Sequence, residues 1–143
     1  MALGSKHGRK WRVGIQHPRQ PGPMATVELA DGEAIGTSGD YQRFFEVDGK
    51  RYPHLLDPRT GHPVTHTQSV TVLIPPGAKA GTLSDAFSKP IFIAGPDDWR
   101  QMAKRMEIGM VLRVDRDGQL FATEALNQRL EFVAKRPAVT VVP

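Results

Sequence analysis

The sequence predicts an α+β domain, a mostly antiparallel sheet with about two helices. Three observations lead to this prediction. Short runs that alternate apolar and polar residues, or that are rich in β-branched residues, recur along the chain. Aspartate-glycine pairs accompany several of these runs, and such pairs are typical of tight turns between antiparallel strands. Two stretches in the second half have the composition and apolar spacing of helices.

The first strands are expected at residues 11–15, 25–29 and 34–39. WRVGI alternates like a strand, and the proline- and glycine-rich HPRQPGP that follows it is a loop. ATVEL is the second strand, and the pair Asp31-Gly32 turns the chain after it. AIGTS begins the third strand, which stops at Gly39.

Two turn motifs precede the strand expected at the centre of the sheet. FFEVDGKRYPHLL reads as a hairpin around Asp48-Gly49, with apolar strand residues on both sides. DPRTG at 57–61 is a tight turn, with proline at its second position and glycine at its end. SVTVLI at 69–74 is a continuous run rich in β-branched residues, which indicates a central strand.

A buried helix is expected at residues 80–94, and a second helix starts at Pro96. We expect Pro90 to kink the first helix, because proline has no N–H and its ring clashes with the preceding turn. Such a kink would swing Asp85 relative to the preceding strand. A further hairpin surrounds Asp117-Gly118. The domain is expected to span residues 1–135, with a loosely ordered tail at 136–143.

Length and composition limit the classes of function. The 143 residues suffice for one domain with a real core, and the absence of cysteine excludes disulfides, thiolate metal sites and cysteine nucleophiles. The net charge of +4 comes from scattered cations, densest at Lys6, Arg9, Lys10 and Arg12. With no recognisable nucleic-acid motif, this favours a basic soluble surface over nucleic-acid binding.

No apolar run is long enough to span a membrane. The basic N-terminal stretch has no apolar segment behind it, so it does not read as a signal peptide. As written, the chain is expected to be cytoplasmic.

Two stretches contain residues suited to binding or catalysis. In TSGDY at 37–41, small residues at a strand end allow a ligand to approach the backbone, although a simple turn is the alternative. His54 precedes the rigid turn, where it could contact a ligand, transfer a proton or pack as a neutral core histidine. Asp57 reads as the carboxylate that caps this turn. His62 and His66 are separated by a proline and lack a suitably spaced carboxylate, which argues against zinc.

Asp85 and Lys89 are four residues apart, so a helix places them on one face. The surrounding small and apolar residues suggest burial, and a buried carboxylate needs a partner. That partner could be Lys89 or a hard cation such as Mg²⁺. An exposed pair of this kind would stabilise the helix by only about 0.3–0.5 kcal/mol.

The motifs in order resemble one family. AIGTSGDYQRFFEVDGKRYPHLLDPRTGHPV, followed by SVTVLIPPGAKAGTLSDAFSKPIFIAG, closely resembles the ApbE-type flavin transferases, the FAD:protein FMN transferases formerly called thiamine biosynthesis lipoproteins. WRVGIQHPR and MVLRVDRDGQLFAT resemble the same family, so the similarity covers roughly residues 3–130.

This resemblance implies a T-fold-like half of a flavin transferase. Family members hold FAD with Mg²⁺ and move FMN onto a threonine hydroxyl of an acceptor redox protein, releasing AMP. By resemblance, His54 matches a histidine that assists transfer, and Asp85 matches a metal-ligating aspartate. The residues that would contact FAD are Thr37, Ser38, Gly39, Asp40, Leu56 and Asp57.

Two departures from the family pattern stand out. The family metal motif usually reads Asp-Ala-x-x-Thr, whereas Lys89 occupies the threonine position here. A protonated ammonium cannot ligate a metal, so Lys89 would replace the cation, and transfer would be lost or weakened. The chain also resembles only the C-terminal half of the family. A flavin transferase of doubtful activity is therefore expected, and a non-catalytic flavin-binding or interaction module is the alternative. The half-length resemblance is compatible with a subunit that pairs with an N-terminal-half chain, a homodimer or a truncated remnant. Family proteins are usually periplasmic or membrane-anchored.

Overall fold

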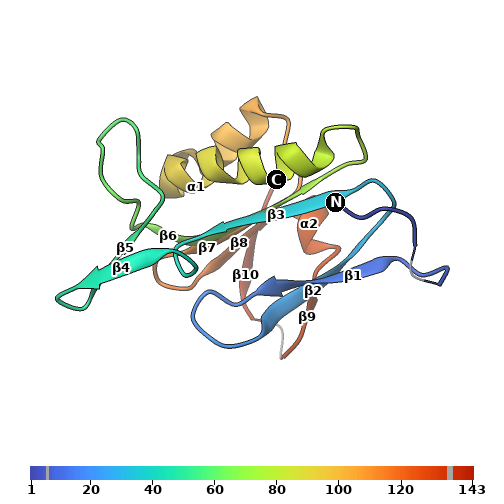
Figure 1. The fold of residues 1–143 in the computed structure, drawn as a ribbon, viewed down its shortest axis with the longest axis horizontal. Coiled ribbons are helices and arrows are strands. Elements are labelled where there is room, and N and C mark those ends of the chain that lie inside the picture. Colours follow the sequence, from blue (N-terminus) through green and yellow to red (C-terminus); the bar gives the residue numbers. More distant parts are fainter. Residues whose placement is uncertain (6, 135–136) are drawn as a thin grey trace.

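The computed structural model describes residues 1–5, 7–134 and 137–143 (Figure 1). In chain order its elements are β1 (Trp11–Gln16), β2 (Pro23–Leu29), β3 (Ala34–Gly39), β4 (Phe44–Val47), β5 (Lys50–Pro53), β6 (Thr67–Ile74), α1 (Ala80–Arg105), β7 (Val111–Asp115), β8 (Leu120–Thr123), α2 (Glu124–Asn127), β9 (Glu131–Phe132) and β10 (Val139–Val142).

A five-stranded sheet with the order β10-β8-β7-β6-β3 forms the middle layer. Helix α1 covers one face, while the three-stranded sheet β1-β2-β9 and α2 lie on the other (Figure 1). Strands β4 and β5 form a separate hairpin that projects from one end of the molecule. Only β10 and β8 pair in parallel among the described strands, so the predicted α+β class with a mostly antiparallel sheet is confirmed.

Strand β6 is the centre of the domain, as its β-branched sequence predicts. All of its residues are buried, and it pairs with β3 on one side and β7 on the other. Because successive side chains point to opposite faces, Val70, Val72 and Ile74 pack towards α1, while Leu73 joins the core beneath the sheet. Two apolar cores therefore meet across this one strand.

Helix α1 bends at Gly95, so the predicted kink at Pro90 is wrong. Gly95 is the only residue inside the helix with non-helical dihedrals, at φ 84° and ψ −173°. Glycine tolerates this backbone region, and Pro96 adds the loss of an N–H at the same place. Pro90 continues the helix because the carbonyl that loses its donor belongs to Ala86, which is on the exposed side where water can satisfy it. The expected boundary between helices 80–94 and 96 onwards coincides with this bend.

The remaining strands agree with the sequence in most places. The hairpins around Asp48-Gly49 and Asp117-Gly118 are present as β4–β5 and β7–β8. The segment expected to be a loose tail instead contains β10, whose alternating VTVV sequence pairs with β8 and buries Val142. Arg136, where that tail was expected to start, lies outside the described residues, as does Lys6 of the basic cluster.

None of the helices in the described part of the chain combines the length and apolar character needed to cross a membrane.

Candidate functional site

Strand β3 lies directly against the first half of α1. A Cβ atom added to Gly36 would lie 2.3 Å from the carbonyl oxygen of Ser84 and 3.1 Å from the backbone nitrogen of Asp85. Only glycine permits this approach, because real Cβ contacts do not come so close. The contact places the middle of β3 beside the helical turn that carries Asp85.

Side-chain hydroxyl groups of the TSGD block, residues 37–40, form hydrogen bonds with both α1 and β6. Ser38 Oγ and Ser88 Oγ share a buried hydrogen bond of 2.8 Å, which joins β3 to α1. Thr37 Oγ1 and Thr71 Oγ1 share another of 2.8 Å, which joins β3 to β6. Thr37 itself is exposed. The block is therefore a rigid strand end with one exposed hydroxyl residue.

The backbone at Gly39 is covered by a neighbouring side chain. A Cβ atom at Gly39 would lie 2.3 Å from Cε1 of Tyr41, whose ring folds back over the strand. Burial raises the pKa of the Tyr41 phenol, and the negative charge of Asp40 acts in the same direction. The space that the sequence suggested for a ligand at Gly39 is therefore used by Tyr41.

Asp40 is buried and paired with an arginine that the sequence did not suggest. Arg19, in the loop between β1 and β2, donates from its two terminal nitrogens to Oδ1 at 2.7 Å and Oδ2 at 2.6 Å. The backbone N–H of Asp40 also donates to the carbonyl of Gln68 at 3.0 Å. Both oxygens of Asp40 thus accept hydrogen bonds from one guanidinium group.

His54 is an exposed histidine at the base of the β4–β5 hairpin, so the core-packing interpretation is wrong. Its Nδ1 lies 2.9 Å from the carbonyl oxygen of Arg43, and its Nε2 lies 3.5 Å from the Arg43 guanidinium. Because a carbonyl only accepts, Nδ1 carries the proton. In the neutral ring the lone pair of Nε2 then accepts the long hydrogen bond from Arg43, because a guanidinium only donates.

Asp57 caps the turn after His54, as predicted. Its Oδ1 accepts the backbone N–H of Arg59 at 2.9 Å, and its carbonyl accepts those of Thr60 at 3.1 Å and Gly61 at 2.7 Å. The Arg59 side chain also pairs with the carboxylate at 2.8 Å. Hydrogen bonds from this side chain hold the pKa of Asp57 below its usual value. Leu56 is exposed beside the turn.

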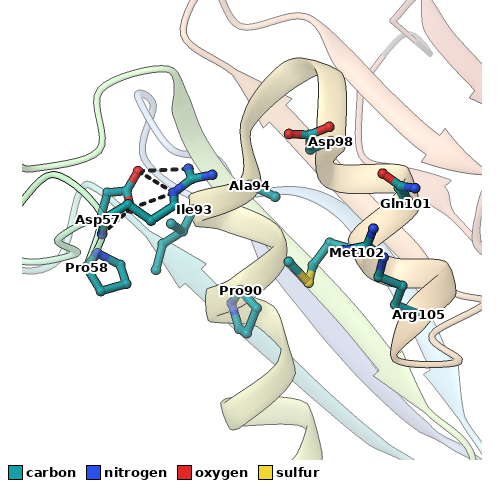
Figure 2. Close-up of a pocket in the computed structure, with 10 residues that line it drawn as sticks. Asp57, Pro58, Pro90, Ile93, Ala94, Asp98, Gln101, Met102 and Arg105 are labelled. Carbon is teal, nitrogen blue, oxygen red and sulfur yellow. Dashed lines mark hydrogen bonds and ion pairs between the residues drawn. The ribbon is translucent and has the colours of Figure 1, made fainter.

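A cavity of about 410 Å³ separates this turn from α1. Figure 2 shows Asp57 and Pro58 on one side and residues from both sides of the α1 bend on the other. The volume falls in the range typical of small-molecule sites. The lining residues are Asp57, Pro58, Arg59, Pro90, Ile93, Ala94, Asp98, Gln101, Met102 and Arg105.

Asp85 and Lys89 form a surface ion pair, so the predicted burial of Asp85 is wrong. The Asp85 side chain is 83% exposed, and Lys89 Nζ lies 2.7 Å from Oδ1. The same ammonium donates to the Asp85 carbonyl at 2.9 Å. The inward positions of this helical segment are Ser84 and Ser88, which turns Asp85 towards solvent.

The residues around Asp85 do not fit a magnesium ion. Mg²⁺ requires oxygen ligands in an octahedral arrangement. Proteins usually supply one or two carboxylates to this ion, and water and substrate phosphates complete its ligands. An ammonium group already contacts the one carboxylate expected to bind the ion.

A buried polar cluster beneath the α1 bend was not anticipated. Arg113 is 1% exposed and donates to Thr67 Oγ1 at 3.0 Å and to the His66 carbonyl at 3.0 Å. Thr67 Oγ1 also lies 2.8 Å from His66 Nδ1, and the His66 ring packs on Gly95. Burial lowers the pKa of Arg113, and burial followed by the charge of Arg113 lowers the pKa of His66.

Comparisons with known proteins identify the family. The sequence model of the ApbE family matches residues 1–112. The chain is 43% identical over 131 residues to the FAD:protein FMN transferase of Rhodobacter capsulatus, covering 92% of this chain and 24% of that protein. It is 36% identical over 119 residues to the FAD:protein FMN transferase of Klebsiella pneumoniae, covering 81% of this chain and 32% of that protein.

Solved structures agree with these relatives. The crystal structure of the apbe protein from Thermotoga maritima superimposes with a TM-score of 0.76 at 35% identity, over 88% of this chain and 40% of that one. The apo form of Pseudomonas stutzeri flavinyl transferase ApbE superimposes with a TM-score of 0.66 at 35% identity, over 94% of this chain and 41% of that one. The chain thus spans well under half the length of these relatives. Matching in sequence over most of its length and in fold, it belongs to the ApbE family.

Proposed function

We propose that this chain is a flavin-binding part of an FAD:protein FMN transferase. Its ligand would be FAD, and the acceptor would be a threonine hydroxyl of a redox protein. The relatives described above bear this activity in their names. In the TSGD block at 37–40 the exposed Thr37 is the proposed FAD contact, together with Leu56 and Asp57, while Ser38, Gly39 and Asp40 form the strand end that holds it.

The contact between β3 and α1 is the observation that carries this proposal. Two sequence blocks far apart in the chain, one around Ser38 and one around Ser88, meet through a buried hydrogen bond of 2.8 Å. The close packing of Gly36 on Ser84 holds the same pair of segments together. Both blocks carry the family resemblance, and packing them together is what a shared ligand site requires.

His54 is proposed to act as the base in the transfer step. The acceptor hydroxyl would attack the phosphorus of the FMN half, so that a new P–O bond forms as the bond to AMP breaks and AMP leaves. The hydroxyl proton would pass to Nε2 of His54, whose lone pair is available once the hydroxyl displaces the 3.5 Å hydrogen bond from the Arg43 guanidinium, while Nδ1–H keeps its bond to the Arg43 carbonyl. The exposed position of His54 keeps that nitrogen within reach of an acceptor protein.

Lys89 is proposed to take the place of the family metal. Its ammonium lies 2.7 Å from the Asp85 carboxylate, where it neutralises the charge that would attract a cation. A single ammonium offers less charge than Mg²⁺ and cannot coordinate phosphate oxygens as a metal does. We therefore expect flavin binding without Mg²⁺ and a transfer rate well below that of a metal-dependent enzyme.

A non-catalytic module that pairs with another chain is the second candidate. It is favoured by the exposed apolar side chains of the projecting hairpin, Phe44, Phe45 and Val47. That partner would be an N-terminal-half chain or a second copy of this one.

The test is a titration of FAD into the purified chain, followed by flavin fluorescence anisotropy with and without Mg²⁺. The Lys89→Thr variant is measured beside it, with Lys104→Thr as the matched control in the last turn of the same helix. The proposal is supported if the original chain binds FAD equally well with and without Mg²⁺, and if Lys89→Thr binds FAD only with Mg²⁺. Mg²⁺-dependent binding by the original chain would contradict the replacement by Lys89. No binding by either would contradict flavin binding by this chain alone.

A further inference from the structure

The loop between β1 and β2 is folded around the imidazole of His17. Nδ1 of His17 accepts the backbone N–H groups of Arg19 and Gln20, each at 3.1 Å. The backbone N–H of His17 donates to the carbonyl of Gly22 at 3.1 Å, and the Gln16 amide donates to the carbonyls of His17 and Gln20. A loop with this many internal hydrogen bonds has few alternative conformations.

This loop delivers Arg19 to the end of β3. The Arg19 guanidinium reaches Asp40 in the two-pronged arrangement that matches a carboxylate, at 2.7 and 2.6 Å. It also donates to the Pro18 carbonyl at 3.0 Å, which fixes the orientation of its plane. The Asp40 side chain is 11% exposed and that of Arg19 is 36% exposed. The arginine therefore shields the carboxylate from water.

Asp40 directly follows Gly39 at the end of the block proposed to contact FAD. Its carboxylate cannot stay buried without a counter-charge, because an uncompensated charge in a protein interior is very costly. Without the guanidinium, Asp40 would turn to solvent and draw the adjacent backbone with it. The bond from the Asp40 N–H to the Gln68 carbonyl at 3.0 Å would loosen at the same time.

We propose that Arg19 is a positioning residue for flavin binding: it holds Asp40 and so fixes the strand end at Thr37, Ser38 and Gly39. This inference rests on the proposed function. Asp40 then supports the strand end and does not contact the flavin directly, because Arg19 engages both of its oxygens. Arg19 acts through Asp40 and need not touch the ligand.

The experiment measures FAD affinity by fluorescence anisotropy in the unchanged chain and in Arg19→Gln, Arg19→Lys and Asp40→Asn. Arg12→Gln is the matched control, since Arg12 lies on the adjoining strand β1 and pairs at the surface with Glu131. We expect Arg19→Gln to raise the Kd for FAD roughly tenfold, by analogy with the loss of hydrogen-bond partners that orient metal ligands. Arg19→Lys should be intermediate because it keeps the charge without the two-pronged geometry. Arg12→Gln should leave the Kd unchanged.

Two readouts separate positioning from a general effect on stability. In the Asp40→Asn background, Arg19→Gln should cause no further change in Kd, because the pair acts as one unit. Amide hydrogen exchange without FAD should speed up at Asp40 in Arg19→Gln and not in Arg12→Gln. If Arg19→Gln does not fold, Arg19→Lys carries the same test.

The outcomes distinguish this inference from the proposed function. If the unchanged chain binds FAD and the Arg19 variants bind equally well, the positioning role is wrong and flavin binding stands. A further loss of affinity in the Asp40→Asn background would also overturn it, because Arg19 would then act by another route. If the unchanged chain does not bind FAD, the proposed function and the positioning role fall together.

Discussion

Ser38 on β3 and Ser88 on α1 share a hydrogen bond of 2.8 Å inside the domain, fifty residues apart in the chain. Ser88 also donates to the Asp85 carbonyl at 2.9 Å, so its single proton is shared between two acceptors unless Ser38 is the donor. With Ser38 donating to Ser88 and Ser88 donating to the carbonyl, all three groups are satisfied. These two hydrogen bonds therefore connect β3 to α1 through Ser38, Ser88 and the Asp85 carbonyl.

Removing both serines should cost less than the sum of the two single losses. Ser88→Ala leaves the Ser38 hydroxyl buried without a partner, and we expect a loss of about 1–2 kcal/mol in the free energy of unfolding. The double variant with Ser38→Ala should lose clearly less than the sum of the two single losses, because neither side then has an unpaired group. Urea unfolding of the four proteins gives the coupling energy. Additive losses would show that the hydroxyls are independent.

Gly36 should not tolerate a side chain. In Gly36→Ala the new Cβ would lie 2.3 Å from the Ser84 carbonyl, so β3 or α1 must shift. We expect the free energy of unfolding to fall by about 2–3 kcal/mol, at the upper end for overpacking. Gly77→Ala is the control, because nothing lies within 4 Å of a Cβ atom there. Equal stability of the two variants in urea unfolding would contradict the close packing.

His66 should make stability depend on pH. Its pKa in the folded chain is lowered from 6.5, mainly by burial and then by the nearby Arg113, although Asp57 and a hydrogen bond with the Ile93 backbone act in the opposite direction. The unfolded chain therefore binds the proton more readily. The contribution to stability is fully present above pH 6.5 and is lost as pH falls through the lower folded value.

Urea unfolding between pH 7.5 and about 5 checks the predicted effect of His66 on the free energy of unfolding. We expect it to decrease on acidification in the original chain and to change less in His66→Gln, whose amide can replace the neutral ring. His62→Gln, at an exposed histidine of the preceding turn, should behave like the original chain. A decrease that persists unchanged in His66→Gln would assign the effect to other groups.

Arg59 should control the ionisation of Asp57. The pKa of Asp57 is held below 3.8, first by the side-chain hydrogen bonds from Arg59 and then by its backbone N–H. In Arg59→Gln the pKa should rise towards that value, because the guanidinium donors are gone. An NMR titration of the Asp57 carboxyl carbon measures the change directly. An unchanged titration would mean that the backbone N–H alone maintains the shift.

The sequence predicts well the features that depend on neighbouring residues. Alternation locates β1, β2 and β3, the Asp48-Gly49 pair locates a hairpin, and the β-branched run identifies β6 as central. The change of helix near Pro96 is also visible, although Gly95 supplies the bend and Pro90 does not. These features follow from local geometry, which a short stretch of sequence encodes.

Features that depend on tertiary contacts could not be predicted. The small polar residues Ser84 and Ser88 face inward because β3 approaches closely there, so the burial expected for Asp85 is reversed. The pairs Arg19–Asp40 and Glu33–Arg129 join residues 21 and 96 positions apart. No spacing rule links such partners, since the fold alone brings them together.

The projecting β4–β5 hairpin has a consequence for how the purified chain behaves. It forms a two-stranded sheet of its own, and Phe45 stacks on Tyr52 with ring centroids 5.1 Å apart on its exposed surface. In a two-stranded sheet neither outer edge has a strand beside it, and unprotected apolar edges pair with edges of other molecules. Concentrated solutions should therefore form oligomers by adding strand to strand, and dilution or a charged residue in place of Phe45 should keep the molecules apart.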